Sequence, residues 1–237
     1  MAVLTSTIAW FLDPAHWTGV DGVPSRTGEH VILSVLAVVI ASAIALPAGL
    51  VVGHADRGER IATAVAGIGR AVPSYALLIL FVPFFGLGFS SALPALVLLA
   101  IPPILVNTVT GIRDVDADTV EAGRGMGMTG REVLMDVEVP AALPVIIVGL
   151  RTSAVQVVAT TTLAALVAGG GLGRYIVDGF ARQQDDRIVA GAFLVAVLAI
   201  VTERFFTWIQ RQLEGRPGTL RLDVPIAPSP FGGRVAD

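Results

Sequence analysis

The chain of 237 residues contains no cysteine and no lysine, so disulfide bonds and thiol chemistry are excluded and all 16 basic residues are arginine. The three histidines, His16, His30 and His54, are not spaced as ligands of a metal site. No metal and no cofactor is therefore expected. Charged residues make up only 15% of the chain, against about 25% in an ordinary soluble domain.

The chain is rich in apolar residues. Hydrophobic residues make up 54% of the chain and the mean hydropathy is +0.77, which indicates an integral membrane protein. Since a spanning helix needs roughly 20 apolar residues, the length allows one membrane domain of about five to six transmembrane helices. We therefore expect an all-α polytopic membrane protein with no room for a second soluble domain.

Long uncharged runs place the spanning helices. Residues 31–53 carry no charge and predict a first span that Pro47 would bend, and the 42 uncharged residues 71–112 predict two further spans joined at 86–91. The second span should begin near Ile61, with Arg70 and Pro73 inside it or just below it, while Pro102-Pro103 predicts a break in the third. The fourth and fifth spans are expected at about 144–168 and 188–208.

The remaining segments complete the predicted organisation. Residues 1–29 are interpreted as an extracytoplasmic or interfacial segment with Trp10, Phe11 and Trp17 at the headgroups, or as a partly ordered tail. Residues 30–210 form the membrane domain, and 211–237 a cytoplasmic disordered tail. Whether 1–29 or 170–185 adds a further membrane helix stays open. We expect 174–187 to be external and partly amphipathic.

A glycine run at 169–173 could be mistaken for a nucleotide-binding loop. It lacks the Lys-Ser/Thr that completes a phosphate loop and the strand that should precede it, so we interpret it as a flexible exit from the bilayer. The chain is therefore not expected to hydrolyse ATP or to be an enzyme.

Arginine positions predict the orientation. With the N-terminus outside, nine arginines lie inside and four outside, in agreement with the positive-inside rule. The inner group is Arg57, Arg60, Arg113, Arg124, Arg131, Arg211, Arg216, Arg221 and Arg234, and the outer group is Arg26, Arg174, Arg182 and Arg187. This orientation places residues 114–140, the longest polar interruption, in the cytoplasm.

The polar segment 114–140 has the pattern of two short capped helices. Asp118 and Thr129 each stand three residues before a glutamate, the order of a capping box. Between them, Gly125-Met126-Gly127-Met128 offers a glycine turn and two soft, adaptable methionines. The pattern fits a plain capped loop and equally a docking surface for a cytoplasmic partner.

Glu121-Ala122-Gly123, with Gly127, Val137 and Val139-Pro140, resembles the E-A-A-x3-G-x9-I-x-L-P loop of bacterial ATP-binding-cassette importer permeases. The departures are Gly123 for alanine and valine for isoleucine and leucine. The resemblance implies a type I importer permease fold in the bacterial inner membrane. It also implies that this loop couples the chain to an ATPase subunit through Glu121, Ala122, Gly123, Met126, Gly127, Met128 and Pro140.

Further segments resemble the glycine betaine, choline and osmoprotectant branch of these importers. They are residues 72–78 (VPSYALL), 102–108 (PPILVNT), 121–129 (EAGRGMGMT), 149–152 (GLRT) and 163–173 (LAALVAGGGLG). The branch implies as partners two ATPase subunits, a second permease chain, identical or sister, and an external solute-binding protein, besides membrane lipid. Nucleic acid is not among them. With two tyrosines, the chain is not expected to form a complete aromatic cage for a quaternary ammonium ion.

Polar residues in the spans are candidates for the translocation pathway or for hydrogen bonds between helices. They are Asn107, Gln156, Thr160 and Thr161. Arg151 is expected to face protein or water, in a structural role between helices. Two alternatives are a permease for methionine or another amino acid and an ion-coupled secondary transporter. The second is disfavoured because no internal repeat is found and Glu203 is the only acid in a predicted span.

Overall fold

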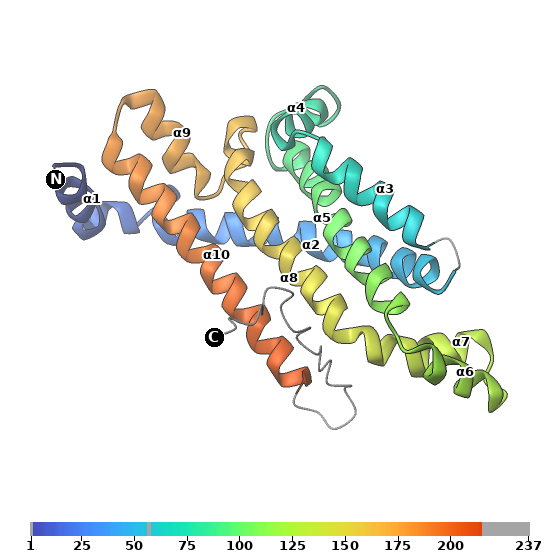
Figure 1. Cartoon of the computed structure of the whole chain (residues 1–237). Coiled ribbons are helices and arrows are strands. Elements are labelled where there is room, and N and C mark those ends of the chain that lie inside the picture. Colours follow the sequence, from blue (N-terminus) through green and yellow to red (C-terminus); the bar gives the residue numbers. More distant parts are fainter. Residues whose placement is uncertain (1, 56–57, 215–237) are drawn as a thin grey trace, which may run out of the picture.

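The computed structural model describes residues 2–55 and 58–214, and within these ranges every regular element is helical. The elements in order are α1 (Ala2–Leu12), η1 (Pro14–Trp17), α2 (Val23–His54), α3 (Gly58–Ala71), α4 (Ser74–Phe85), α5 (Phe89–Arg113), α6 (Ala117–Gly125), α7 (Gly130–Glu132), η2 (Val133–Glu138), α8 (Val139–Ala164), η3 (Ala165–Val167), α9 (Gly173–Arg182) and α10 (Asp185–Glu214). The expectation of an all-α protein is confirmed (Figure 1).

Four helical segments are long and apolar enough to cross a membrane, namely Val23–His54, Phe89–Arg113, Gly130–Val167 and Asp185–Leu213. A fifth span is added if α3 and α4, which are bent by 82°, count as one. The first span begins at Val23 rather than Val31, and the fourth merges with the end of the polar segment. In the described part of the chain, the segments at 1–29 and 170–185 add no further helix of that length.

Two proline sites behave differently from each other. Pro73 ends α3 and precedes α4, because it lacks an N–H and disfavours helical geometry at Val72, so the expected second span is two helices. Pro102 and Pro103 lie inside α5, which continues to Arg113, so the expected break there is wrong. Ser153 of α8 donates its hydroxyl to the carbonyl of Ala100 at 2.9 Å, a neighbouring polar contact at the depth of the two prolines.

Small residues allow a close contact between α2 and α5. The buried face of α2 includes a run of small residues that repeats every four positions, namely Ala37, Ala41, Ala45, Gly49 and Gly53. A Cβ atom at Gly49 would lie 2.7 Å from Thr108 Cβ, and one at Gly53 would lie 2.9 Å from Ile112 Cβ. The spacing is the small-residue pattern by which membrane helices approach closely.

The N-terminal segment is folded, so the alternative of a partly ordered tail is wrong. Trp10 is 6% exposed, with its ring stacked on His16 at 4.2 Å and edge-on to Tyr175 of α9 at 5.3 Å. Trp10 is therefore buried against protein, whereas Trp17 is exposed, as an interfacial residue would be. The predicted amphipathic segment at 174–187 covers helix α9 from its second residue and the start of α10.

The glycine run forms a defined turn rather than a flexible exit. Gly170 and Gly171 have φ of +82° and +77°, a region in which glycine is favoured. The Gly171 N–H donates to Glu29 Oε2 at 2.8 Å, and the Leu172 N–H donates to His30 Nδ1 at 3.2 Å. Two side chains of α2 therefore hold the turn in place.

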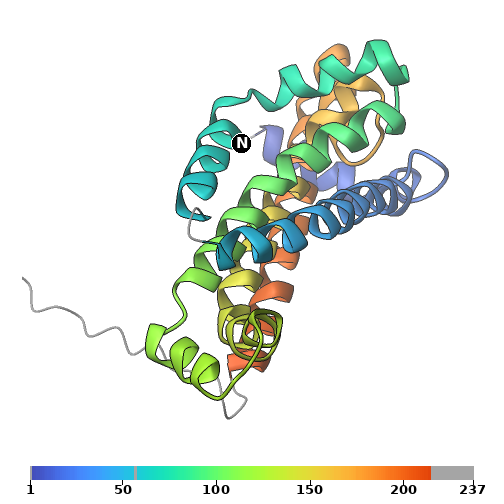
Figure 2. The ribbon, with the colours of Figure 1, turned by 90° about the vertical axis from the view of Figure 1, so that its right-hand side faces the viewer.

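Both views place α6 and α7 at one end of the bundle and α9 at the other (Figures 1 and 2). Among described arginines, α6 and α7 carry Arg124 and Arg131 at the first end, while α9 carries Arg174 and Arg182 at the second. These four arginines, two from each group used to predict the orientation, thus lie at opposite ends of the bundle. Helix α10 extends to Glu214, so residues 211–214 are helical, and the rest of the predicted tail lies outside the described residues.

Candidate coupling site

Helix α6 stands at the end of α5 and presents the first motif residues. It begins at Ala117 with Asp116 in the N-cap position, so the prediction of Asp118 as the cap is wrong. Asp118 instead lies in the first turn of α6, where the positive end of the helix dipole stabilises its carboxylate. Glu121 and Ala122 are exposed on α6.

The turn after α6 is a Schellman motif. The Met128 N–H donates to the Gly123 carbonyl at 3.3 Å, the Gly127 N–H donates to the Arg124 carbonyl at 3.0 Å, and Gly127 has φ of +86°. The Met128 side chain folds back against α6. Its Sδ atom would lie 3.3 Å from a Cβ atom placed at Gly123. The predicted glycine turn is confirmed at Gly127, and Met128 packs beneath α6 while Met126 is 78% exposed.

The predicted capping box at Thr129 is confirmed. Glu132 Oε2 accepts from the Thr129 N–H at 2.7 Å, and Thr129 Oγ1 accepts from the Glu132 N–H at 3.4 Å. The helix that starts here does not stay short. It passes through a π-helical segment, Val133–Glu138, directly into α8, so the second expected loop helix is the beginning of a spanning helix. Pro140 is exposed at the second position of α8.

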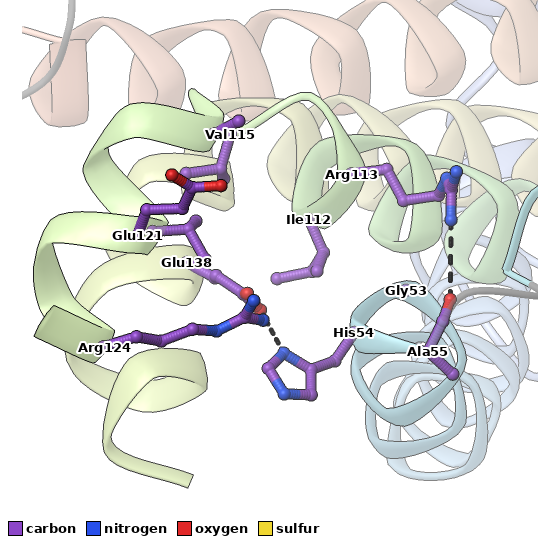
Figure 3. Close-up of a pocket in the computed structure, with 11 residues that line it drawn as sticks. Gly53, His54, Ala55, Ile112, Arg113, Val115, Glu121, Arg124 and Glu138 are labelled. Carbon is purple, nitrogen blue, oxygen red and sulfur yellow. Dashed lines mark hydrogen bonds and ion pairs between the residues drawn. The ribbon is translucent and has the colours of Figure 1, made fainter. Parts of the chain in front are cut away.

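A cavity of about 310 Å³ lies between α6 and the ends of the spanning helices. Its lining includes the C-terminal end of α2, the α5–α6 connection and the π-helical segment, which contributes Glu138 (Figure 3). His54 Nδ1 lies 2.7 Å from Glu138 Oε2, and Glu138 is 5% exposed. Arg113 donates to the Ala55 carbonyl at 3.4 Å on one side, while Arg124 points toward His54 and Glu138 from the other.

Sequence reasoning missed both His54 and Glu138. Glu138 lies at a position that the loop motif leaves free, between Val137 and Val139, and His54 is 84 residues away in the chain. A histidine at the end of a span and a glutamate near the start of another were available as signals. Only the fold brings them into contact.

The four candidate pathway residues do not share one environment. Asn107 donates to the Pro103 carbonyl within α5, and Thr161 is fully buried, with its Oγ1 3.1 Å from Ser34 Oγ of α2. Gln156 is exposed on α8, and Thr160 lies four residues further along. Gln156 and Thr160 form a polar stripe with the exposed Thr152, a residue that was not predicted. These three residues, at i, i+4 and i+8, are here called the α8 stripe.

Arg151 links α8 to α10, as expected of a structural residue between helices. Its Nε lies 3.6 Å from Glu203 Oε1, and its Nη1 donates to Gln210 Oε1 at 3.4 Å. The charge of a residue in a spanning helix is therefore paired within the bundle.

The described helices have the fold of type I ABC importer permeases, as two solved structures show. The fold matches that of a chain in an inward-facing structure of the MetNI methionine ABC transporter, with a TM-score of 0.72 and 20% identity over 81% of this chain and 95% of that one. A chain of an amino acid ABC transporter solved with histidines matches with a TM-score of 0.66 and 19% identity, over 79% of this chain and 92% of that one.

The chain belongs to the family described as the binding-protein-dependent transport system inner membrane component, which matches residues 45–215. It is 38% identical to the glycine betaine/carnitine/choline transport system permease protein OpuCB of Bacillus subtilis, over 79% of this chain and 87% of that protein. It is 35% identical to the osmoprotectant import permease protein OsmW of Salmonella typhimurium, over 88% and 95%. The chain is thus a multi-pass inner-membrane transport subunit, and it is not itself an enzyme.

Proposed function

We propose that the chain is the permease subunit of an ATP-driven, binding-protein-dependent importer of osmoprotectants such as glycine betaine, choline or a related quaternary ammonium compound. The substrate class is supported by the family match and by the identity of 35–38% to osmoprotectant permeases, and the coupling role is supported by the geometry of the coupling site. An exposed helix, α6, is locked by a Schellman turn and a capping box onto a segment that continues without interruption into spanning helix α8. Such a connection transmits displacement of α6 to the membrane.

The partners follow from this role. Two ATPase subunits bind and hydrolyse ATP, a second permease chain completes the pathway, and an extracytoplasmic binding protein delivers the solute. Glu121, Ala122 and Met126 are exposed on or next to α6 and form the contact with the ATPase, while Gly123 and Met128 support that surface from below. Gly127 sets the bend, and Pro140 lies where the displacement enters α8.

The translocation pathway is assigned to the α8 stripe, Thr152, Gln156 and Thr160. The hydroxyls of Thr152 and Thr160 donate to carbonyls one turn earlier in α8, so the exposed amide of Gln156 is the group that is unfavourable against lipid. The face that carries Gln156 therefore meets water or another protein chain. A pathway between two permease chains satisfies both conditions. Asn107 and Thr161 remain predicted pathway residues, although their hydrogen bonds here lie within the bundle.

Ion-coupled transport is the less favoured mechanism because three acids in the described spans are paired with other groups of the bundle. Glu203 pairs with Arg151, Glu138 with His54, and Glu29 with Arg26 and the Gly171 N–H. Transport of methionine or another amino acid is the alternative within the same superfamily. The structural similarity to such transporters, at about 20% identity, concerns the fold alone.

The test is uptake in a host that lacks its own osmoprotectant importers. The chain is expressed with the ATPase and binding protein encoded beside it, and labelled glycine betaine, choline, carnitine and methionine are offered separately. We expect ATP-dependent uptake of betaine or choline that disappears when this chain is omitted. Uptake of methionine alone would retain the importer and refute the substrate class, whereas uptake that follows an ion gradient without ATP would refute the importer.

A further inference from the structure

The His54–Glu138 pair joins two spanning segments at the coupling end. His54 is the last residue of α2, and Glu138 is the last residue of the π-helical segment that leads into α8. The Glu138 side chain is almost fully buried, while that of His54 is 27% exposed. Because an unpaired carboxylate is costly to bury, the contact with His54 fixes where the two segments meet.

The π-helical segment explains why Glu138 reaches His54. A π-helical turn holds more residues than an α-helical turn, so it changes which residues face the bundle. Here it buries Val133 and Glu138, five residues apart, while Met135 and Asp136 between them are exposed. Such segments recur at functional positions in helices.

His54 also lies close to the beginning of this helix. A Cβ atom at Gly130 would be 3.7 Å from His54 Nε2, so the imidazole lies between the first turn at Gly130 and the carboxylate of Glu138. The other charged groups around the cavity are Arg113, Glu121 and Arg124. Figure 3 shows His54 and Glu138 joined across the cavity between α2 and the π-helical segment.

We infer that His54 and Glu138 are positioning residues that make α2 move together with the start of α8 when α6 is displaced. This inference rests on the proposed function. Without the pair, displacement of α6 would pass along the chain into α5, through residues 114–116, and into α8, and neither of these covalent routes includes α2. With it, the displacement also enters α2, which packs along α5 through its small-residue face, so three spanning helices respond as one body.

The test uses the complete transporter, with its ATPase and binding protein, reconstituted in liposomes. Solute uptake and ATP hydrolysis are measured together, and the readout is solute imported per ATP hydrolysed. The variants are Glu138→Gln, His54→Gln and the exchange of both residues, His54→Glu with Glu138→His. The matched control is Asp136→Asn, which removes an exposed carboxylate from the same π-helical segment.

We expect each single variant to hydrolyse ATP while the imported solute per ATP falls roughly fivefold or more, the lower end of typical coupling between two sites. The exchange should restore much of the ratio, and Asp136→Asn should not change it. Wild-type ratios in both single variants would overturn the inference. They would leave the proposed function intact, because that function fails only if the wild-type transporter shows no binding-protein-dependent uptake.

A second experiment replaces the contact with a covalent link. Since the chain has no cysteine, His54→Cys with Glu138→Cys introduces the only two thiols in this subunit. A short bismethanethiosulfonate reagent then links them covalently. If residues 54 and 138 stay in contact throughout the transport cycle, the linked transporter should import more solute per ATP than the unlinked double variant. Loss of uptake on linking would overturn the inference.

Discussion

Replacing Gly127 with valine tests whether the turn between α6 and the π-helical segment couples ATP hydrolysis to transport. Gly127 has φ of +86°, and nothing lies within 4 Å of a Cβ built there. The cost of a side chain therefore comes from the backbone and not from a clash. Placing a residue other than glycine in this left-handed conformation costs about 1–2 kcal/mol of conformational free energy. For a β-branched residue the cost lies at the upper end of this range or above it.

A cost of about 2 kcal/mol shifts the balance between the native turn and competing turns by about 30-fold. The motif that holds Met128 beneath α6 depends on this turn, so α6 would be aimed wrongly. We expect Gly127→Val to retain basal ATP hydrolysis in the assembled transporter and to lose most binding-protein-dependent uptake. Both rates are measured in proteoliposomes.

Two control variants separate the backbone effect from side-chain bulk. Gly125→Val places the same side chain two residues earlier, where φ is not positive and no atom lies within 4 Å of the new Cβ, so uptake should remain near wild type. Gly127→Asn should retain most uptake, because asparagine tolerates left-handed geometry. Full uptake by Gly127→Val, or equal losses at positions 125 and 127, would refute the reasoning.

Three further substitutions have outcomes set by local geometry. Gly123→Ala introduces the alanine of the motif and should stabilise α6 by about 0.5–1 kcal/mol. The new Cβ would meet the Sδ atom of Met128, whose flexible side chain can move aside. A lower melting temperature of the variant would contradict this. Gly49→Ala meets Thr108 Cβ at 2.7 Å and should cost about 1–3 kcal/mol in unfolding free energy, whereas Gly28→Ala in the same helix has open space and should not. Thr129→Ala removes the capping box and should cost about 1 kcal/mol, measured by thermal unfolding of the detergent-solubilised subunit, while equal stability of variant and wild type would show that the cap is not needed.

Several features of the coupling site were predictable because they depend on neighbours in the sequence. Thr129 and Glu132 cap each other across three residues, and Gly127 takes the left-handed conformation that ends α6. The sequence pattern placed the N-cap of α6 at Asp118, two residues after the observed N-cap Asp116. Asp116 and Asp118 both suit an N-cap, and the end of α5 at Arg113 decided where the next helix could start.

Contacts between distant segments could not be predicted in this way. Glu138 and His54 are 84 residues apart, and Glu29 and Gly171 are 142 apart, so no local pattern marks either pair. The glycine run therefore looked flexible in the sequence, although side chains of α2 fix it. The polar segment looked like two short helices, but its second helix continues into α8.

The sequence by itself determined the membrane class, the approximate position of each apolar span and the chemistry of the coupling loop, because hydrophobicity, caps and glycine turns act over a few residues. The tertiary structure decided the rest. Pro73 separates two helices while Pro102 and Pro103 remain inside one, although all three lack the same N–H. The difference lies in the neighbours, because whether a helix continues through proline depends on packing and hydrogen bonds from other helices.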